Sequence, residues 1–184
     1  MRAIARPVNW VSLTGTLAFS AAVTSLLLYY QDELESMGDW VYLGAFLTQL
    51  VNNATILLPA LGQAFIVATG ASLDPYLLGV FGGIGAALGE ITGYLLGLAG
   101  RHTLLKDGDR FGKLLGHNHR WAGVTIFFFA LTPLPFDLAG IWAGSDRYPL
   151  GRFFFYTAAG KIISTTGLAL AGYYSVSWLE RVFD

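Results

Sequence analysis

The sequence predicts an all-α integral membrane protein, and composition, charge placement and an internal repeat lead to this prediction. Of the 184 residues, 54% are hydrophobic and 12% are charged, whereas about a quarter are charged in a typical soluble domain. The 11 basic and 12 acidic side chains are too few to cover the surface of a soluble domain of this length. This composition argues against a soluble enzyme, a nucleic-acid binder and a disordered chain. The absence of cysteine argues against a disulfide scaffold.

Three uncharged or nearly uncharged stretches are long enough to span the ~30 Å hydrocarbon core of a bilayer. The first, residues 9–31, is predicted to be a retained N-terminal transmembrane helix, with a cleaved signal peptide as the alternative. An acidic loop follows at residues 31–39. The other two predicted spanning helices are residues 76–100 and 153–178, and each carries a single charged side chain.

Two further apolar segments, 40–73 and 121–145, do not read as single helices, because prolines, glycines and polar residues interrupt them. Lysine and arginine concentrate in three segments: residues 1–8, 101–120 and 146–152. The positive-inside rule then places the N-terminus in the cytoplasm and the C-terminus outside, in a multi-pass protein of the cell membrane. Opposite sides for the two termini require an odd number of crossings. The two interrupted segments are therefore predicted to be re-entrant hairpins, with kinked full spans as the alternative.

An internal repeat supports this topology. Shifting the chain by 74 residues aligns residues that fix backbone shape, and it aligns one polar pair: Pro59 with Pro133, Gly70 with Gly144, Pro75 with Pro149, and Gln63 with Asp137. Each unit, about 45–100 and 121–178, is a broken hairpin followed by one spanning helix, so the second unit is inverted relative to the first. The predicted organisation is an N-terminal helix and acidic loop over 1–39 and a core of inverted repeats over 40–184.

Three charged residues are predicted at membrane depth: Glu90, Asp137 and Lys161. A charge at the centre of the bilayer costs at least ~2.5 kcal/mol, so these side chains should face the protein interior or water. Lys161 is a candidate partner for either acid. Such a group indicates a centre that binds a proton or a lipid head group; a buried pair that only holds helices together is the alternative. Tyr94, one turn after Glu90, is predicted to hydrogen-bond its carboxylate.

Other polar and shape-determining residues are weaker candidates. The remaining residues predicted along a transport path are Pro133, Pro135, Gln63 and Asn53. Asn52 and Asn53 are predicted to cap backbone groups of the first hairpin, with lining of a cavity mouth as the alternative.

Arg147 and Arg152 are candidates for lipid-phosphate contacts at the membrane boundary, and ordinary anchoring explains them equally well. The three histidines lack a supporting carboxylate, so no metal site and no cofactor are predicted. No cluster of serine, histidine and acid lies at membrane depth, so no enzymatic activity is predicted.

Four glycines recur every four residues in the second predicted spanning helix: Gly85, Gly89, Gly93 and Gly97. This spacing gives a face of small residues against which another backbone packs closely. Packing within one chain is the first interpretation, and a homodimer through this face is the second.

The stretch from Leu131 to Gly144, followed by Phe153–Phe155 and Gly160-Lys161, resembles the signature of the DedA/VTT superfamily, and most closely its vacuole membrane protein branch. Gly89-Glu90 with Tyr94, Gly97 and Gly100 is similar to the acidic glycine helix of the family, and Pro59 to Gly70 is similar to its first hairpin.

The resemblance implies two inverted re-entrant hairpins that face each other, with Glu90 and Asp137 as the functional acids. It also implies lipid movement, either phospholipid scrambling or recycling of the undecaprenyl phosphate carrier. The bacterial DedA pattern has arginines where this chain has Ala130 and Phe136, which favours the scramblase-like function.

The predicted function is lipid translocation between leaflets through a polar groove between the two hairpins, with membrane lipids as the partners. The alternatives are a proton-coupled small-solute or undecaprenyl-phosphate transporter that uses the same acids, and a non-transporting organiser of membrane complexes.

Overall fold

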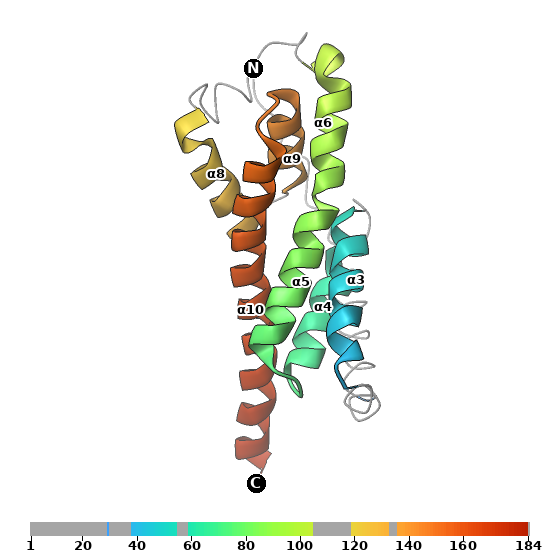
Figure 1. Cartoon of the computed structure of the whole chain (residues 1–184). Helices are drawn as coiled ribbons and strands as arrows, with labels where there is room; N and C mark the ends of the chain where they lie inside the picture. Colours follow the sequence, from blue (N-terminus) through green and yellow to red (C-terminus); the bar gives the residue numbers. More distant parts are fainter. Residues whose placement is uncertain (1–28, 30–37, 55–58, 105–118, 133–135, 184) are drawn as a thin grey trace, which may run out of the picture.

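The computed structural model describes residues 29, 38–54, 59–104, 119–132 and 136–183. This part of the chain is helical and contains no strand, which confirms the predicted all-α class. Its helices are, in order: α3 (Trp40–Ala54), α4 (Pro59–Gly70), α5 (Pro75–Gly89), α6 (Ile91–Leu104), α8 (His119–Leu131), α9 (Asp137–Ser145) and α10 (Leu150–Phe183) (Figure 1). Outside the described residues lie nearly all of the predicted helix at 9–31, most of the polar loop at 101–120, and both Pro133 and Pro135.

Two helical hairpins account for the two interrupted segments of the sequence. α3 and α4 form the first hairpin and α8 and α9 the second, and in each a break separates two short helices. In Figure 1 the first hairpin has its open ends at the lower end of the molecule, and the second has its open ends at the upper end. Each hairpin extends along only part of the length of α10. In the sequence, the interruptions of the two apolar segments therefore fall between α3 and α4 and between α8 and α9.

The long helical segments begin at matching signals. Asp74 Oδ1 accepts hydrogen bonds from the backbone N–H groups of Tyr76 at 2.8 Å and Leu77 at 3.0 Å. Pro75 stands at the first helical position, where no N–H is needed. At the start of α10 the carbonyl of Pro149 accepts a bond from Phe153 N–H at 2.9 Å. The two prolines that align in the 74-residue shift therefore each start a long helical segment.

α5 and α6 continue each other, and α10 runs antiparallel to them (Figure 1). Glu90 separates α5 from α6, yet its N–H still donates to Ala86 at 3.0 Å and its carbonyl still accepts from Tyr94 at 3.3 Å. Among the described residues, Pro75–Gly100 is the one helical segment long and apolar enough to cross a membrane. In the most apolar 18 residues of this segment, 56% are buried. Because the core helix of a soluble protein can be equally long and apolar, this helix alone is weak evidence for a membrane protein.

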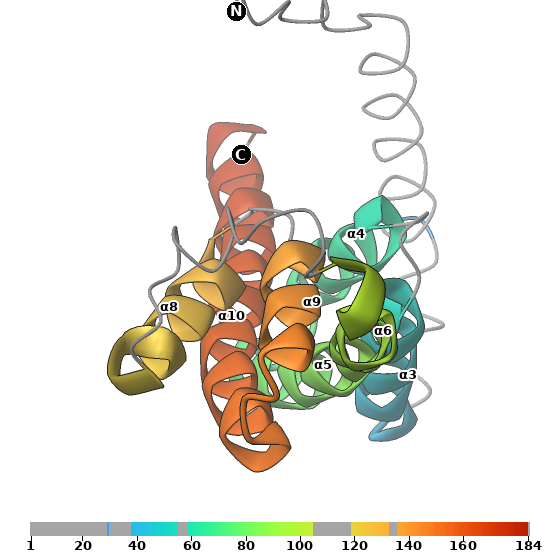
Figure 2. The same ribbon diagram turned by 90° about the horizontal axis from the view of Figure 1, so that it is seen from above.

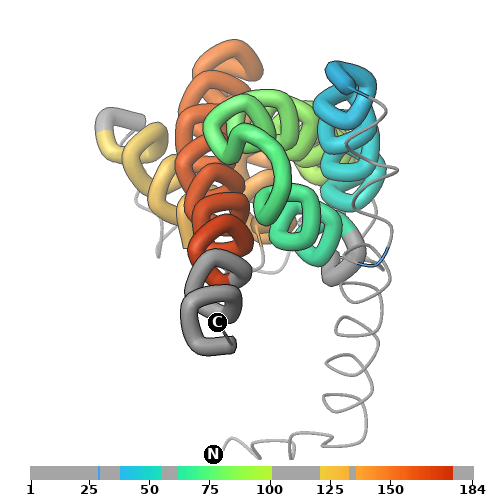
Figure 3. Tube along the Cα trace, turned by 90° about the horizontal axis from the view of Figure 1, so that it is seen from below, coloured from blue at the N-terminus to red at the C-terminus, as the bar shows by residue number. Residues whose placement is uncertain are grey.

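The predicted spanning helix at 153–178 lies within α10. α10 is long enough to cross a membrane, but its mean hydropathy is lower than that of Pro75–Gly100 and it is not among the candidate spans. Lys161, the hydroxyl run Ser164-Thr165-Thr166 and several glycines lower its mean hydropathy. These polar and small residues lie in a helix that contacts α5, α8 and α4. The view from above and the view from below agree that α8 lies on one side of α10 and that α5 and α4 lie on the other (Figures 2 and 3).

Glycines let the hairpins approach the long helices closely. A Cβ atom added to Gly97 would overlap the carbonyl oxygen of Ile141, and one added to Gly144 would overlap that of Tyr94, so α6 and α9 touch backbone to backbone. Gly70 and Gly172 make the equivalent contacts between α4 and α10. Small residues at such crossings are typical of helices that associate in lipid.

The four-residue glycine repeat is used in the same way. Gly85 packs against the carbonyl of Phe46, and Gly89 packs against Leu50 and Ala54, all in α3. Gly93 and Gly97 face α9 instead. The repeat therefore serves packing within one chain, and a homodimer, which stays a prediction, would need another surface.

Large apolar side chains cover much of the outside of the helices. They include Trp40, Val51, Leu96, Trp121, Phe128 and Phe155, each more than half exposed. Many of the buried apolar side chains are alanines. Small residues inside and large apolar residues outside indicate a surface that meets lipid rather than water.

Candidate functional site

A charged centre lies between two apolar clusters. One cluster contains Tyr94 of α6 and Phe153 of α10, and the other contains Leu78 of α5 and Ala169 of α10. Glu90 lies between Leu78 and Tyr94 in the chain, and Lys161 lies between Phe153 and Ala169. Each long helical segment therefore carries its buried charge at the boundary between the two clusters.

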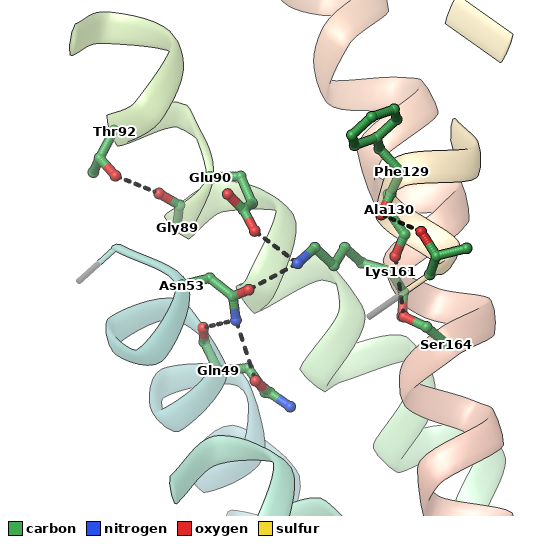
Figure 4. Close-up of polar contacts among 10 residues, drawn as sticks. Gln49, Asn53, Gly89, Glu90, Thr92, Phe129, Ala130, Lys161 and Ser164 are labelled. Atoms are coloured by element: carbon green, nitrogen blue, oxygen red, sulfur yellow. Dashed lines mark hydrogen bonds and ion pairs between the residues drawn. The ribbon is translucent and has the colours of Figure 1, made fainter. Parts of the chain in front are cut away.

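The centre is built on an ion pair between the two long helical segments. Lys161 Nζ lies 2.6 Å from Glu90 Oε1, and the side chains are 15% and 4% exposed. Lys161 Nζ also donates to Asn53 Oδ1 at 2.9 Å (Figure 4). The Phe136 ring lies beneath the ammonium, with its centroid 5.1 Å away, which adds a cation–π contact. Lys161 thus joins α3, the α5–α6 junction and the turn of the second hairpin.

A second group of hydrogen bonds extends the centre into the first hairpin. Asn53 Nδ2 donates to the backbone carbonyl of Gln49 at 2.8 Å and to its side-chain oxygen at 3.2 Å. Gln49 Nε2 donates in turn to the carbonyl of Gly62 in α4 at 3.4 Å. Asn52 Oδ1 accepts from the N–H of Gly62 at 3.4 Å, as the predicted capping role requires. The side chains of α3 therefore hold the first hairpin together and present Asn53 to the ammonium.

Asp137 brings a second carboxylate close to the ion pair. It starts α9 and is half-buried, and its backbone packs against Gly93, one turn from Glu90. Within the described residues no cation pairs with Asp137, whereas Glu90 is paired with Lys161. Asp137 is therefore a second carboxylate next to the ion pair, with no ammonium of its own.

The structure brings some of the predicted site residues together and separates others. Glu90, Lys161 and Asn53 are in direct contact, and the expected pairing of Lys161 with an acid is confirmed for Glu90. The backbone of Asp137 lies against Gly93, one helical turn from Glu90. Gln63 is exposed on α4 and, among the described contacts, does not join this network. Pro133 and Pro135 lie outside the described residues.

The expected hydrogen bond from Tyr94 to Glu90 is wrong. The Tyr94 hydroxyl donates to the carbonyl of Tyr148 at 2.7 Å, and its ring packs on Phe153 with centroids 5.2 Å apart. The phenol oxygen lies at the far end of a long side chain and reaches the end of α9. Tyr94 therefore fixes the second hairpin against α6.

The two arginines lie at the exposed junction between α9 and α10. Arg147 has a positive φ of 56° and donates its N–H to Gly144 at 3.1 Å, while Tyr148 N–H reaches Ala143 at 2.8 Å. This pair of bonds is the usual glycine-type termination of a helix, here made by an arginine. Arg147 and Arg152 are both exposed, so both are available to anionic groups outside the bundle.

Two residues of the centre were not predicted from the sequence: Gln49 and Phe136. Gln49 is 3% exposed and stands four residues before Asn53, so the spacing of two amides on one helical face was an available signal. Phe136 carried no such signal, because aromatic residues are common in apolar segments.

Comparison with known proteins identifies a family to which the chain is similar. The model of the VTT domain matches residues 58–174, more than half of the chain. Searches of curated proteins and of solved structures found no match. The matched region contains Glu90, Asp137 and Lys161, whereas α3, with Gln49 and Asn53, precedes it. The VTT domain, also called DedA, defines membrane proteins associated with lipid or solute transport. The chain belongs to this VTT-domain family of membrane proteins.

Proposed function

We propose that this protein moves lipids between the two leaflets of the cell membrane, as a scramblase or flippase rather than as an enzyme. The observation that carries the proposal is the buried Glu90–Lys161 ion pair, which lies where the turns of both hairpins meet the long helical segments. Charged groups at such a depth are costly and are typically functional.

In this proposal the two hairpins are re-entrant and belong to inverted repeats that enter from opposite sides. Their different open ends support this interpretation (Figure 1). Backbone that breaks at the turns has to be satisfied by protein or water, because hydrocarbon offers no hydrogen bonds. A polar groove between the turns is the arrangement that meets this need. The N-terminus is then cytoplasmic and the C-terminus extracytoplasmic.

The chemistry of the centre supports passage of a head group. A lipid head group crossing hydrocarbon loses its hydrogen bonds to water, and the carboxylates and amides of the groove replace them while the acyl tails stay in lipid. Because Lys161 neutralises Glu90 and Asp137 adds a second carboxylate one helical turn away, the centre favours one further positive charge. The ammonium of a zwitterionic head group supplies it.

The same surplus of negative charge favours a second candidate function. A proton is the smallest group that balances two carboxylates and one ammonium, and a proton-coupled transporter of small solutes or of undecaprenyl phosphate uses such a centre.

Reconstitution in liposomes with fluorescent lipid analogues tests the lipid proposal. The protein is expected to accelerate leaflet exchange, and Glu90→Gln and Asp137→Asn are expected to slow it by about tenfold or more, a loss of about 1.4 kcal/mol. The matched control is Asp39→Asn, because Asp39 is an exposed acid before α3. No acceleration, or equal rates for all three variants, would overturn the proposal. Solute uptake driven by a pH gradient without lipid exchange would establish the second candidate instead.

A further inference from the structure

Two buried side-chain oxygens, one of them in the ion pair, have no hydrogen-bond partner among the described residues. They are Glu90 Oε2 and Thr157 Oγ1, in side chains of residues that are 4% and 0% exposed. Folded proteins satisfy nearly all buried polar atoms with protein groups or with ordered water. Both atoms therefore indicate a partner other than a side chain of the described residues.

Thr157 differs from other hydroxyl residues in these helices. Thr69, Thr166 and Ser175 donate to the carbonyl four residues earlier, at 2.7, 2.7 and 2.6 Å. This bond is the ordinary way in which a helical hydroxyl is satisfied. Thr157 does not make this bond, so its hydroxyl is not satisfied by the backbone of α10.

Helical spacing puts Thr157 on the same face of α10 as two residues that contact the centre. Phe153, Thr157 and Lys161 are spaced by four residues, so they lie on one face of α10. At one end of this face, Phe153 packs against the rings of Tyr94 and Phe136, with centroids 5.2 and 6.0 Å apart. At the other end, Lys161 contacts both Glu90 and Phe136. From this spacing we infer that Thr157, between the two, is directed toward the α5–α6 junction.

The geometry points to a binding site for one water molecule between Glu90 Oε2 and Thr157 Oγ1. Water donates to the carboxylate and also exchanges a hydrogen bond with the hydroxyl, so it satisfies both atoms at once. A metal ion is disfavoured, because no group of three acidic or histidine side chains is placed to hold one among the described residues and the Lys161 ammonium is adjacent. This site does not depend on lipid transport.

A double-mutant cycle on stability tests the site in the full-length protein in mild detergent. Thr157→Val removes the hydroxyl and keeps the shape. If the hydroxyl is bound through water, this change lowers Tm by about 2–4 °C, the shift expected for one lost hydrogen bond in a chain of this length. If the hydroxyl is simply unpaired, the same change raises Tm.

The second arm of the cycle repeats Thr157→Val in a Glu90→Gln background. A shared water makes the loss smaller there than in the wild type, whereas an equal loss in both backgrounds overturns the site. Thr69→Val is the matched control, because Thr69 is 2% exposed and its hydroxyl is satisfied by Phe65; its effect should not depend on Glu90. If Glu90→Gln does not fold, the sign of the Thr157→Val shift decides alone: a rise in Tm overturns the site.

Discussion

At the scale of single residues, the Glu90–Lys161 pair predicts a strong dependence of stability on both partners. Lys161→Met leaves a buried carboxylate without its ammonium, and such breakage costs about 3–5 kcal/mol. The variant that also carries Glu90→Gln should be less destabilised than the sum of the two single changes, because neither charge is then left alone. Unfolding in denaturant and mild detergent measures this coupling. Arg152→Met, an exposed basic residue, is the control and should change stability by about 0.5 kcal/mol or less. Additive single effects would contradict the pairing.

The sequence predicted the charged members of the centre because charges in an apolar helix are rare and costly. Glu90 and Lys161 are the single charges of their segments, so each had few possible partners. Neutral polar residues are inexpensive in helices, so Thr157 could not be distinguished from ordinary side chains, and Gln49 was marked only by its four-residue spacing from Asn53. Tyr94 was misjudged because helical spacing fixes where a side chain starts, whereas a phenol hydroxyl acts several ångströms further on.

At the scale of helices, glycine contacts predict which crossings are sensitive. Gly97→Ala and Gly144→Ala place a Cβ atom on the backbone of the opposite helix, so α6 and α9 must separate. Such overpacking costs about 1–3 kcal/mol. Gly167 is the matched control: it lies inside α10 and has nothing within 4 Å of an added Cβ. Gly167→Ala should gain about 0.5–1 kcal/mol through helix propensity. Denaturant midpoints of the three variants check this order, and a stabilised Gly144→Ala would contradict it.

The elements were predictable where proline, glycine and aspartate fix the backbone. Pro75 and Pro149 start long helical segments, and the interrupted segments became hairpins. The 74-residue register was less complete. Gly70 and Gly144 obey it, but the glycines that pack on the hairpins from the other side, Gly97 and Gly172, are 75 residues apart (172 − 97). The distance along the chain from the proline to the glycine is thus one residue longer in the second repeat (Pro149 to Gly172) than in the first (Pro75 to Gly97). This difference reflects packing between helices, which the pattern of a single segment does not contain.

At the scale of the whole molecule, the open ends of the two hairpins distinguish re-entrant hairpins from kinked full spans. The open ends of the two hairpins lie at opposite ends of the molecule (Figure 1). In the proposed topology both ends of the first hairpin face the outside, and both ends of the second face the cytoplasm. Kinked spans would instead put the two ends of one hairpin on opposite sides of the membrane. The chain has no cysteine, so single cysteines report their own position without background.

Asp39→Cys and Ser72→Cys mark the ends of the first hairpin, and Asp146→Cys and Arg152→Cys lie after α9 and near the start of α10. An impermeant maleimide is expected to label the first two in intact cells and the last two only after permeabilisation, because the hydrocarbon core blocks a charged reagent. Labelling of Asp39→Cys and Ser72→Cys from opposite sides would show a full span. It would also remove the opposed hairpin turns on which the lipid groove depends, while leaving the Glu90–Lys161 pair as a purely structural bond between helices.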